Sequence, residues 1–251
     1  MGKIHKSWNN LNEILRNYAY FTHKNTYSVD KTQMKIIITG TTGMIGEGIL
    51  LECLAHPEVT EVLSVSRNPT GKSHPKLKEY IVPDFLNLKE GDLNLQGFDA
   101  CFFCAGISAV GKTEVDYRKV TYDTTLHFAK ILQPKADMCF MYVSGGGTDH
   151  TEQSRMMWAR VKGKTENDLA QLPFKQSFGF RIGFVKATPG QMHVLPYYRY
   201  IAWLFPVFKA LFPGVYNTMH QVANAMVYLT THRYNSRIIY VKDIHHINKM
   251  I

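Results

Sequence analysis

The chain has 251 residues, of which 45% are hydrophobic and 20% are charged. This composition suits one globular domain with a sizeable core, and it excludes disorder along most of the chain. The formal net charge of +9 permits contact with nucleic acid, but the basic residues form no run and match no nucleic-acid-binding motif. We therefore expect a small-molecule substrate and no nucleic-acid partner.

Four cysteines are too few to indicate a disulfide-stapled secreted domain. Cys101 and Cys104 are spaced like a metal or redox pair, but they fall in an apolar run typical of a strand, so we interpret them as buried thiols and predict no metal site. No run of about 18 apolar residues predicts a membrane-spanning helix. The apolar stretch 200–208 has two interpretations, a helix over a substrate pocket and a patch in peripheral contact with a membrane.

Residues 1–33 differ in composition from the rest of the chain and predict an N-terminal appendage. A short amphipathic helix is expected there, because four apolar residues recur at helical spacing: Trp8, Leu11, Leu15 and Tyr18. The basic character of this segment also resembles an organelle transit peptide, and a third interpretation is that the protein begins at Met34. For the whole protein we expect a cytoplasmic location.

From Met34 onward, short apolar runs alternate with longer helical patterns. Strands are predicted near 35–39, 61–66, 79–82, 100–105, 138–144, 178–185 and 237–241. Helices are predicted near 44–55, 113–133, 154–171, 197–212 and 219–231. This alternation over residues 34–251 predicts an α/β fold, a doubly wound parallel sheet of the Rossmann type, with a small helical substrate-side segment at about 187–235.

A glycine-rich turn follows the first predicted strand and opens a helix. Gly40 would permit the tight turn, Gly43 would let the backbone approach a pyrophosphate, and Gly46 would let the helix pack closely on the sheet. In this position the pattern predicts a dinucleotide site. The predicted contact residues of the turn are Gly40, Thr42, Gly43, Met44, Ile45 and Gly46.

The end of the second predicted strand indicates which dinucleotide is bound. Ser66 and Arg67 stand where an acidic residue would grip the ribose of NAD, and Lys72 follows closely. Cationic side chains favour the 2'-phosphate of NADP, so we predict NADP as the cofactor, with NAD as the alternative.

Three further motifs lie at the ends of predicted strands, "PDF" at 83–85, "CAG" at 104–106 and "YVSGGGTD" from 142. With the glycine turn, they make residues 34–251 resemble the atypical, epimerase-like branch of the short-chain dehydrogenase/reductase superfamily. This branch includes Tat-interacting-protein-30-like oxidoreductases and proteins named NAD-dependent epimerase/dehydratase. The resemblance implies that Asp84 and Phe85 lie beside the adenine, and that Ala105 and Gly106 lie along the central part of the cofactor.

The resemblance also implies a catalytic set of serine, tyrosine and lysine. Ser144 matches the serine and Lys162 matches the lysine, whose ammonium would hold the nicotinamide ribose, but Trp158 stands in the place of the tyrosine. An indole N–H is only a donor and has no accessible ionisation, so Trp158 cannot move a proton as the phenol does. Gly163, in the helix interior, predicts close backbone packing against another element.

If catalysis survives, another group moves the proton, and Tyr117, Asp149 and His150 are the candidates nearest the expected mouth; Tyr142 is less suitable because it lies inside a strand. The leading hypothesis is an NADP-dependent oxidoreductase or epimerase-like enzyme for a small carbonyl or alcohol. The alternative is a catalytically silent module that binds NADP(H). The pattern does not indicate an oligomeric state.

Overall fold

The computed structural model describes residues 33–194 and 213–251. Three predictions lie outside these described residues: the amphipathic helix before residue 33, the helix at 197–212 and the apolar patch at 200–208.

Within the described residues, the chain forms a parallel sheet of seven strands in the order β3-β2-β1-β4-β5-β6-β9. The order reverses between β1 and β4, and doubly wound sheets bind their ligands outside the carboxyl ends of the strands at such a point. The predicted doubly wound parallel sheet is confirmed. Its strands are β1 (Met34–Thr39), β2 (Val59–Ser66), β3 (Leu77–Ile81), β4 (Ala100–Phe103), β5 (Cys139–Val143), β6 (Gln176–Arg181) and β9 (Ile238–Tyr240).

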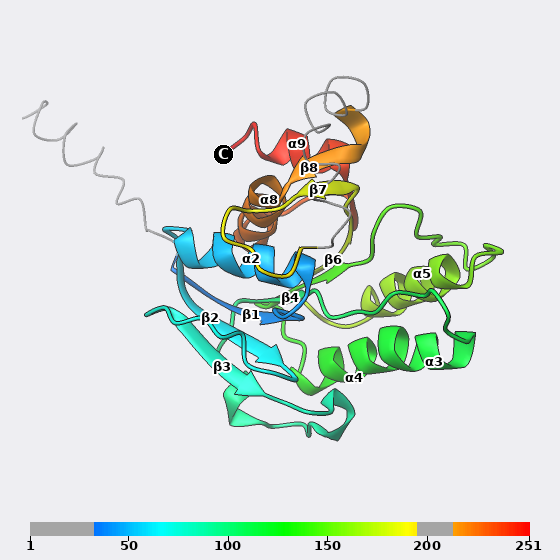
Figure 1. Cartoon of the computed structure of the whole chain (residues 1–251), viewed down its shortest axis with the longest axis horizontal. Helices are drawn as coiled ribbons and strands as arrows, with labels where there is room; N and C mark the ends of the chain where they lie inside the picture. The colour runs from blue at the N-terminus through cyan, green and yellow to red at the C-terminus, as the bar shows by residue number, and fades with distance from the viewer. Residues whose placement is uncertain (1–32, 195–212) are drawn as a thin grey trace, which may run out of the picture. The chain divides into compact units, whose positions relative to one another are not determined.

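Helices cover both faces of this sheet (Figure 1). On one face, α2 (Met44–Ala55) and α8 (Met219–Thr231) pack on each other and on the strands, with α9 (Val241–Ile247) beside them. On the other face lie α4 (Thr124–Ile131) and α5 (Met157–Leu169). Because both faces are covered, a central strand such as β4 is buried at every position.

The predicted helix 113–133 contains an irregular turn. It consists of α3 (Glu114–Arg118), a π-helical turn at Lys119–Asp123, and then α4. The late strand predicted at 237–241 is shorter than expected, because α9 begins at Val241 and was not predicted.

The prediction of one strand over 178–185 is wrong. β6 ends at Arg181, and the next three residues in extended form, β7 (Phe184–Lys186), pair instead with β8 (Tyr216–Thr218) in a separate two-stranded sheet. Ile182 and Gly183 lie between them, and a Cβ on Gly183 would lie 2.2 Å from the carbonyl oxygen of Val215. The chain therefore leaves the main sheet at a point where only glycine lets the two backbones meet.

Candidate functional site

The glycine turn between β1 and α2 lies at the carboxyl edge of the sheet, where the strand order reverses. Gly40 has a φ of +71°, and a Cβ there would lie 2.7 Å from the backbone nitrogen of Ala105, while a Cβ on Gly46 would lie 2.2 Å from the carbonyl oxygen of Gly40. Gly43 is the N-cap of α2, and no side chain among the described residues caps this helix end. The helix therefore offers uncapped N–H groups and the positive end of its dipole to an anion. The other predicted residues of the turn are half-buried: Thr42, Met44 and Ile45.

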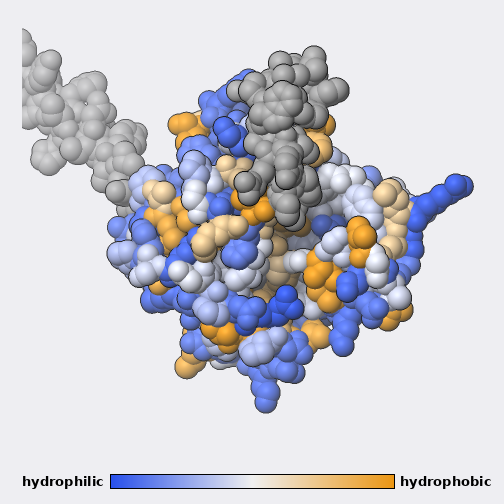
Figure 2. Space-filling view, viewed as in Figure 1, coloured by the Kyte–Doolittle hydropathy of each residue, from blue (hydrophilic) through white to orange (hydrophobic). Residues whose placement is uncertain are grey.

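The backbone after β4 forms the neighbouring part of the site. The hydroxyl oxygen of Thr39 accepts the N–H groups of Cys104 and Ala105, both at 3.1 Å, and so fixes this backbone beside the glycine turn. Gly106 is exposed, and a Cβ there would meet nothing within 4 Å. Figure 2 shows that the surface is hollowed on this face, between the parts that cover α2 and α5. The structure thus brings Ala105 and Gly106 to the predicted phosphate turn.

Two cationic side chains follow β2, Arg67 and Lys72, and their surroundings differ. Arg67 is exposed and has no hydrogen bond or ion pair within residues 33–194 and 213–251. Ser66 is buried, and its hydroxyl donates to the carbonyl oxygen of Asn68 at 2.7 Å. The ammonium of Lys72 lies 2.7 Å from the carboxylate of Glu47 in α2. Of the two predicted cations, only Arg67 is therefore without a partner in the described part of the protein.

Asp84 and Phe85 have clear local roles after β3. The Asp84 carboxylate accepts the N–H of Leu86 at 2.9 Å and caps a short 3-10 turn. The Phe85 ring is 7% exposed and packs on Phe128 with ring centroids 5.3 Å apart. At this place the Phe85 side chain belongs to the core, so the backbone and Asp84 are the groups that can face a ligand.

Ser144 lies directly after β5 and is 1% exposed. Its hydroxyl donates to Glu166 Oε1 at 2.5 Å, and the same carboxylate pairs with Arg181, whose Nη2 lies 2.6 Å from Oε2. A Cβ on Gly179 would lie 2.5 Å from Glu166 Oε1, so the glycine makes room for the carboxylate. Sequence reasoning missed Glu166, although it stands four residues after Lys162, a spacing that puts both side chains on one helix face.

Lys162 points from α5 to the end of β5. Its ammonium donates to the carbonyl oxygen of Ser144 at 2.5 Å, and a Cβ on Gly145 would lie 3.9 Å from Nζ. Burial lowers the pKa of Lys162 to about 8, against the opposing effect of the Glu166 charge. The structure thus brings together Ser144 and Lys162, the two residues that the resemblance matches to the catalytic serine and lysine.

Trp158 lies one turn before Lys162 and packs on the loop after β5. A Cβ on Gly147, whose φ is +83°, would lie 2.9 Å from Cη2 of the indole, so the ring covers a bare stretch of backbone. The tight packing expected at Gly163 is also present, because a Cβ there would lie 1.6 Å from the carbonyl oxygen of Asp149. The indole, the ammonium and this loop form one wall of the site.

The proposed substitutes for the missing phenol differ in their surroundings. Tyr117 is 1% exposed, so it does not lie at the mouth as expected, and burial raises its pKa. Hydrogen bonds from Thr151, Ser154 and Gln153 lower the pKa of Asp149 to about 2. His150 is exposed, and Tyr142 is buried with a raised pKa. The two phenols are thus buried with raised pKa values, and Asp149 is held as a carboxylate at neutral pH by its hydrogen bonds.

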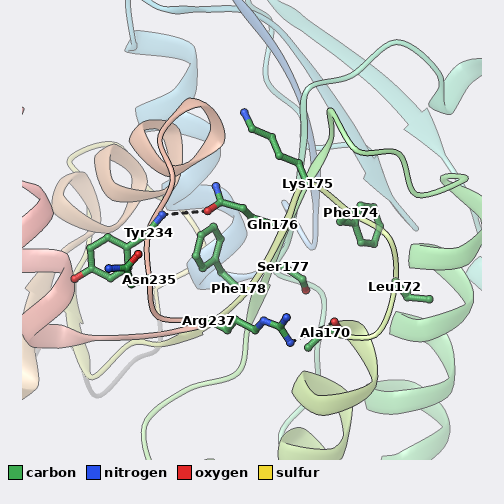
Figure 3. Close-up of a pocket in the computed structure, with 10 residues that line it drawn as sticks. All are labelled: Ala170, Leu172, Phe174, Lys175, Gln176, Ser177, Phe178, Tyr234, Asn235 and Arg237. Atoms are coloured by element: carbon green, nitrogen blue, oxygen red, sulfur yellow. Dashed lines mark hydrogen bonds between the residues drawn. The ribbon is translucent and has the colours of Figure 1, made fainter.

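A second pocket, of about 180 Å³, lies at the opposite edge of the sheet, around the start of β6 (Figure 3). The two cationic side chains that line it donate hydrogen bonds to carbonyl oxygens at the carboxyl ends of helices. Lys175 donates to that of Thr230 at 3.1 Å, and Arg237 donates to that of Ala170 at 3.5 Å. Gln176 accepts the N–H of Tyr234 at 3.1 Å. The pocket contains none of the predicted site residues.

Within the described ranges, no cluster of histidine, cysteine and carboxylate side chains has the geometry of a metal site, and the four cysteines are free thiols. No helix of the described part has the length and apolar character needed to span a membrane.

No protein-family model matches the sequence. The chain is similar to the mitochondrial protein fmp52-1 of Aspergillus terreus, with 26% identity over 159 residues that cover 61% of this chain and 67% of that protein. It is similar to the mitochondrial protein fmp52 of Emericella nidulans, with 27% identity over 157 residues that cover 60% and 66% of the two chains. The alignments thus span about two thirds of these relatives. Their mitochondrial names contradict the cytoplasmic location expected from the sequence.

Solved structures of the same fold are enzymes of the epimerase and dehydrogenase type. ADP-L-glycero-D-manno-heptose-6-epimerase of Helicobacter pylori matches with a TM-score of 0.57 and 16% identity, over 88% of this chain and 82% of the enzyme. UDP-glucuronic acid 4-epimerase of Bacillus cereus, solved with NAD, matches with a TM-score of 0.57 and 14% identity, over 86% of this chain and 82% of the enzyme. The chain therefore has the Rossmann-type fold that these epimerases share with short-chain dehydrogenases.

Proposed function

We propose that this protein binds a nicotinamide dinucleotide, NADP in preference to NAD, between the glycine turn and the end of β4. We further propose an oxidoreductase or epimerase-like activity of the atypical short-chain dehydrogenase type on a small carbonyl or alcohol. The observation that carries the proposal is the uncapped start of α2, set against Gly40 and Ala105 where the strand order reverses. The names of the relatives support a mitochondrial location.

The residues fit the parts of such a cofactor. The N–H of Gly43 already donates to the carbonyl oxygen of Gly40 at 2.9 Å, so the N–H groups of the first turn of α2 would hold the pyrophosphate. The exposed guanidinium of Arg67 would hold the 2'-phosphate. The Lys162 ammonium would donate to the hydroxyls of the nicotinamide ribose. The bound cofactor supplies the hydride chemistry, and these side chains bind and orient it.

A second candidate function is a nucleotide-binding module without turnover. Trp158 has no group that exchanges a proton, and the Ser144 hydroxyl already donates to Glu166, so it is not free to donate to a substrate. In this alternative the protein binds NADP(H) at the same site and responds to its concentration without converting a substrate.

Titration of the purified protein with NADPH and NADH tests the cofactor assignment. We expect NADPH to bind about tenfold more tightly, because Arg67 adds a charge-assisted bond to the 2'-phosphate. Gly43→Asp should weaken both nucleotides by about tenfold or more, since it places a carboxylate at the helix start. Gly214→Asp, at an exposed glycine that is not in the left-handed region and whose added Cβ would meet nothing within 4 Å, is the matched control and should leave both affinities unchanged. Absence of binding, or equal loss in the two variants, would contradict the assignment.

The variant Trp158→Tyr separates the two functions. We expect it to oxidise NADPH with a member of a panel of aldehydes, ketones and quinones, because it restores a phenol one helical turn from Lys162. Trp158→Phe removes the indole without adding a hydroxyl and should show none of the gain in rate expected for Trp158→Tyr. Absorbance at the NADPH band is the measurement. If the parent turns over as fast as Trp158→Tyr, the silent module is excluded and another group moves the proton.

A further inference from the structure

Glu47 is a buried carboxylate that neither the sequence pattern nor the proposed function explains. It lies in the first turn of α2, directly after Gly46, and its side chain is 0% exposed. It accepts hydrogen bonds from Lys72 Nζ at 2.7 Å, from the backbone N–H of Met192 at 2.9 Å and from the backbone N–H of His193 at 2.6 Å. His193 Nδ1 lies 3.0 Å away as well.

The Glu47 junction, meaning Glu47 with Lys72, Met192 and His193, joins three distant parts of the chain. Lys72 belongs to the loop after β2, which carries Arg67 on the adenosine side of the proposed site. Met192 and His193 belong to the segment after β7, which lies beside α2 (Figure 1). One carboxylate therefore connects the phosphate turn to both sides of the site.

Two more contacts hold residues 188–193 along α2. Thr188 donates to Glu52 Oε1 at 2.5 Å, and Gln191 donates to the carbonyl oxygen of Met44 at 2.6 Å. Both bonds act on the same helix, the second of them at its first residue. The segment is thus attached to α2 at several points, with Glu47 as the buried one.

The charge of the junction is balanced within the protein. Burial by itself would raise the pKa of Glu47, but the bonds from Lys72, Met192 and His193 lower it to about 2, so the group is a carboxylate at neutral pH. A bare carboxylate beside a pyrophosphate site would repel the ligand. Lys72 offsets this charge at the helix start.

We propose that Glu47 is a positioning residue that holds residues 188–193 and the loop after β2 against the phosphate turn. Lys72 then neutralises the Glu47 carboxylate and does not bind the 2'-phosphate. Arg67 is then the residue that distinguishes NADP from NAD. This inference rests on the proposed function for its ligand, whereas the junction itself is a property of the protein without ligand.

The nucleotide arm uses Lys72→Met, Arg67→Met and the double variant Glu47→Gln/Lys72→Met. Lys72→Met should weaken NADPH and NADH by the same factor, about tenfold, because it leaves the Glu47 charge bare beside the pyrophosphate. The double variant should recover most of that loss. Arg67→Met should weaken NADPH alone, and Lys78→Met, which removes an exposed lysine paired with Glu61, should change neither affinity.

The second arm is amide hydrogen exchange of the protein without nucleotide. Glu47→Gln should speed exchange at Met192 and His193 by about tenfold or more, because both N–H groups lose a charged acceptor. Glu47→Asp gives the same readout with a milder change, should Glu47→Gln fail to fold, because the side chain that is shorter by one methylene draws the carboxylate away from both amides. Lys78→Met is again the control and should leave these amides protected.

The nucleotide affinities test the role of Lys72, and the exchange rates test whether Glu47 holds residues 188–193. If Lys72→Met weakens NADPH but not NADH, Lys72 reaches the 2'-phosphate and the inference is wrong. If exchange at Met192 and His193 is unchanged in both variants, the junction does not hold the segment, and the inference is again wrong. If the parent binds neither nucleotide, the proposed function fails, and the exchange arm still tests the junction.

Discussion

Gly163→Ala should destabilise the protein by about 3 kcal/mol or more, since an added Cβ that cannot be accommodated forces a backbone shift. In an exposed helix interior the same change normally stabilises by about 1 kcal/mol, because alanine has the higher helix propensity. Here the new Cβ would lie 1.6 Å from the carbonyl oxygen of Asp149 and 3.1 Å from the backbone nitrogen of His150. The free energy of unfolding from urea denaturation is the measurement.

Gly146→Ala is the control for Gly163→Ala. A Cβ on Gly146 would meet nothing closer than 3.7 Å, and this glycine is not in the left-handed region, so we expect a change within about 1 kcal/mol. A neutral or stabilising Gly163→Ala would contradict the close packing of α5 on the loop after β5. The same variant should also weaken nucleotide binding, because it displaces Lys162.

Arg181→Met should destabilise the protein by about 3 to 5 kcal/mol, the usual effect of leaving one member of a buried ion pair without its partner. The side chains of Arg181 and Glu166 are 5% and 2% exposed, and the guanidinium reaches the carboxylate through Nη2 at 2.6 Å and Nε at 3.2 Å. Without the guanidinium, the buried Glu166 carboxylate keeps only one hydrogen-bond donor among the described residues, the Ser144 hydroxyl. Urea denaturation again gives the free energy of unfolding.

Two comparisons give the Arg181 prediction its specificity. Adding Glu166→Gln to Arg181→Met removes both charges and should recover a large part of the loss. Arg160→Met breaks the pair with Glu114, whose side chains are 29% and 45% exposed, and should change the free energy of unfolding by about 1 kcal/mol or less. Equal effects of Arg181→Met and Arg160→Met would show that burial of the first pair contributes nothing.

The sequence alone predicted the sheet, because the strands and the helices that cover them differ in period and length. It also predicted the glycine turn, which depends on local spacing, and the resemblance to the short-chain dehydrogenases implied that Ser144 and Lys162 belong to one site. The strand predicted at 178–185 was wrong because a continuous apolar run does not show that Gly183 meets Val215 from a distant segment.

The buried carboxylates Glu47 and Glu166 were missed for a related reason. A glutamate in a helix is usually solvated, and nothing in its neighbourhood along the chain tells whether a distant donor meets it. Lys72 and Met192, which contact Glu47, lie 25 and 145 residues from it along the chain. Arg181, which pairs with Glu166, lies 15 residues from it. The partners of these two carboxylates could therefore be identified only from the structure, whereas the glycine turn could be identified from the sequence.

The loop between β5 and α5 is fixed to α5 by backbone and side-chain contacts. The N–H of Asp149 donates to the carbonyl oxygen of Ala159 at 3.1 Å, Asn167 donates to the carbonyl oxygen of His150 at 2.9 Å, and the Gly163 contact closes the space between them. Ordering a loop on binding usually removes part of the affinity. This wall is already ordered before any ligand arrives, so a ligand that fits it keeps more of its contact energy, and a ligand that does not fit it is rejected by shape.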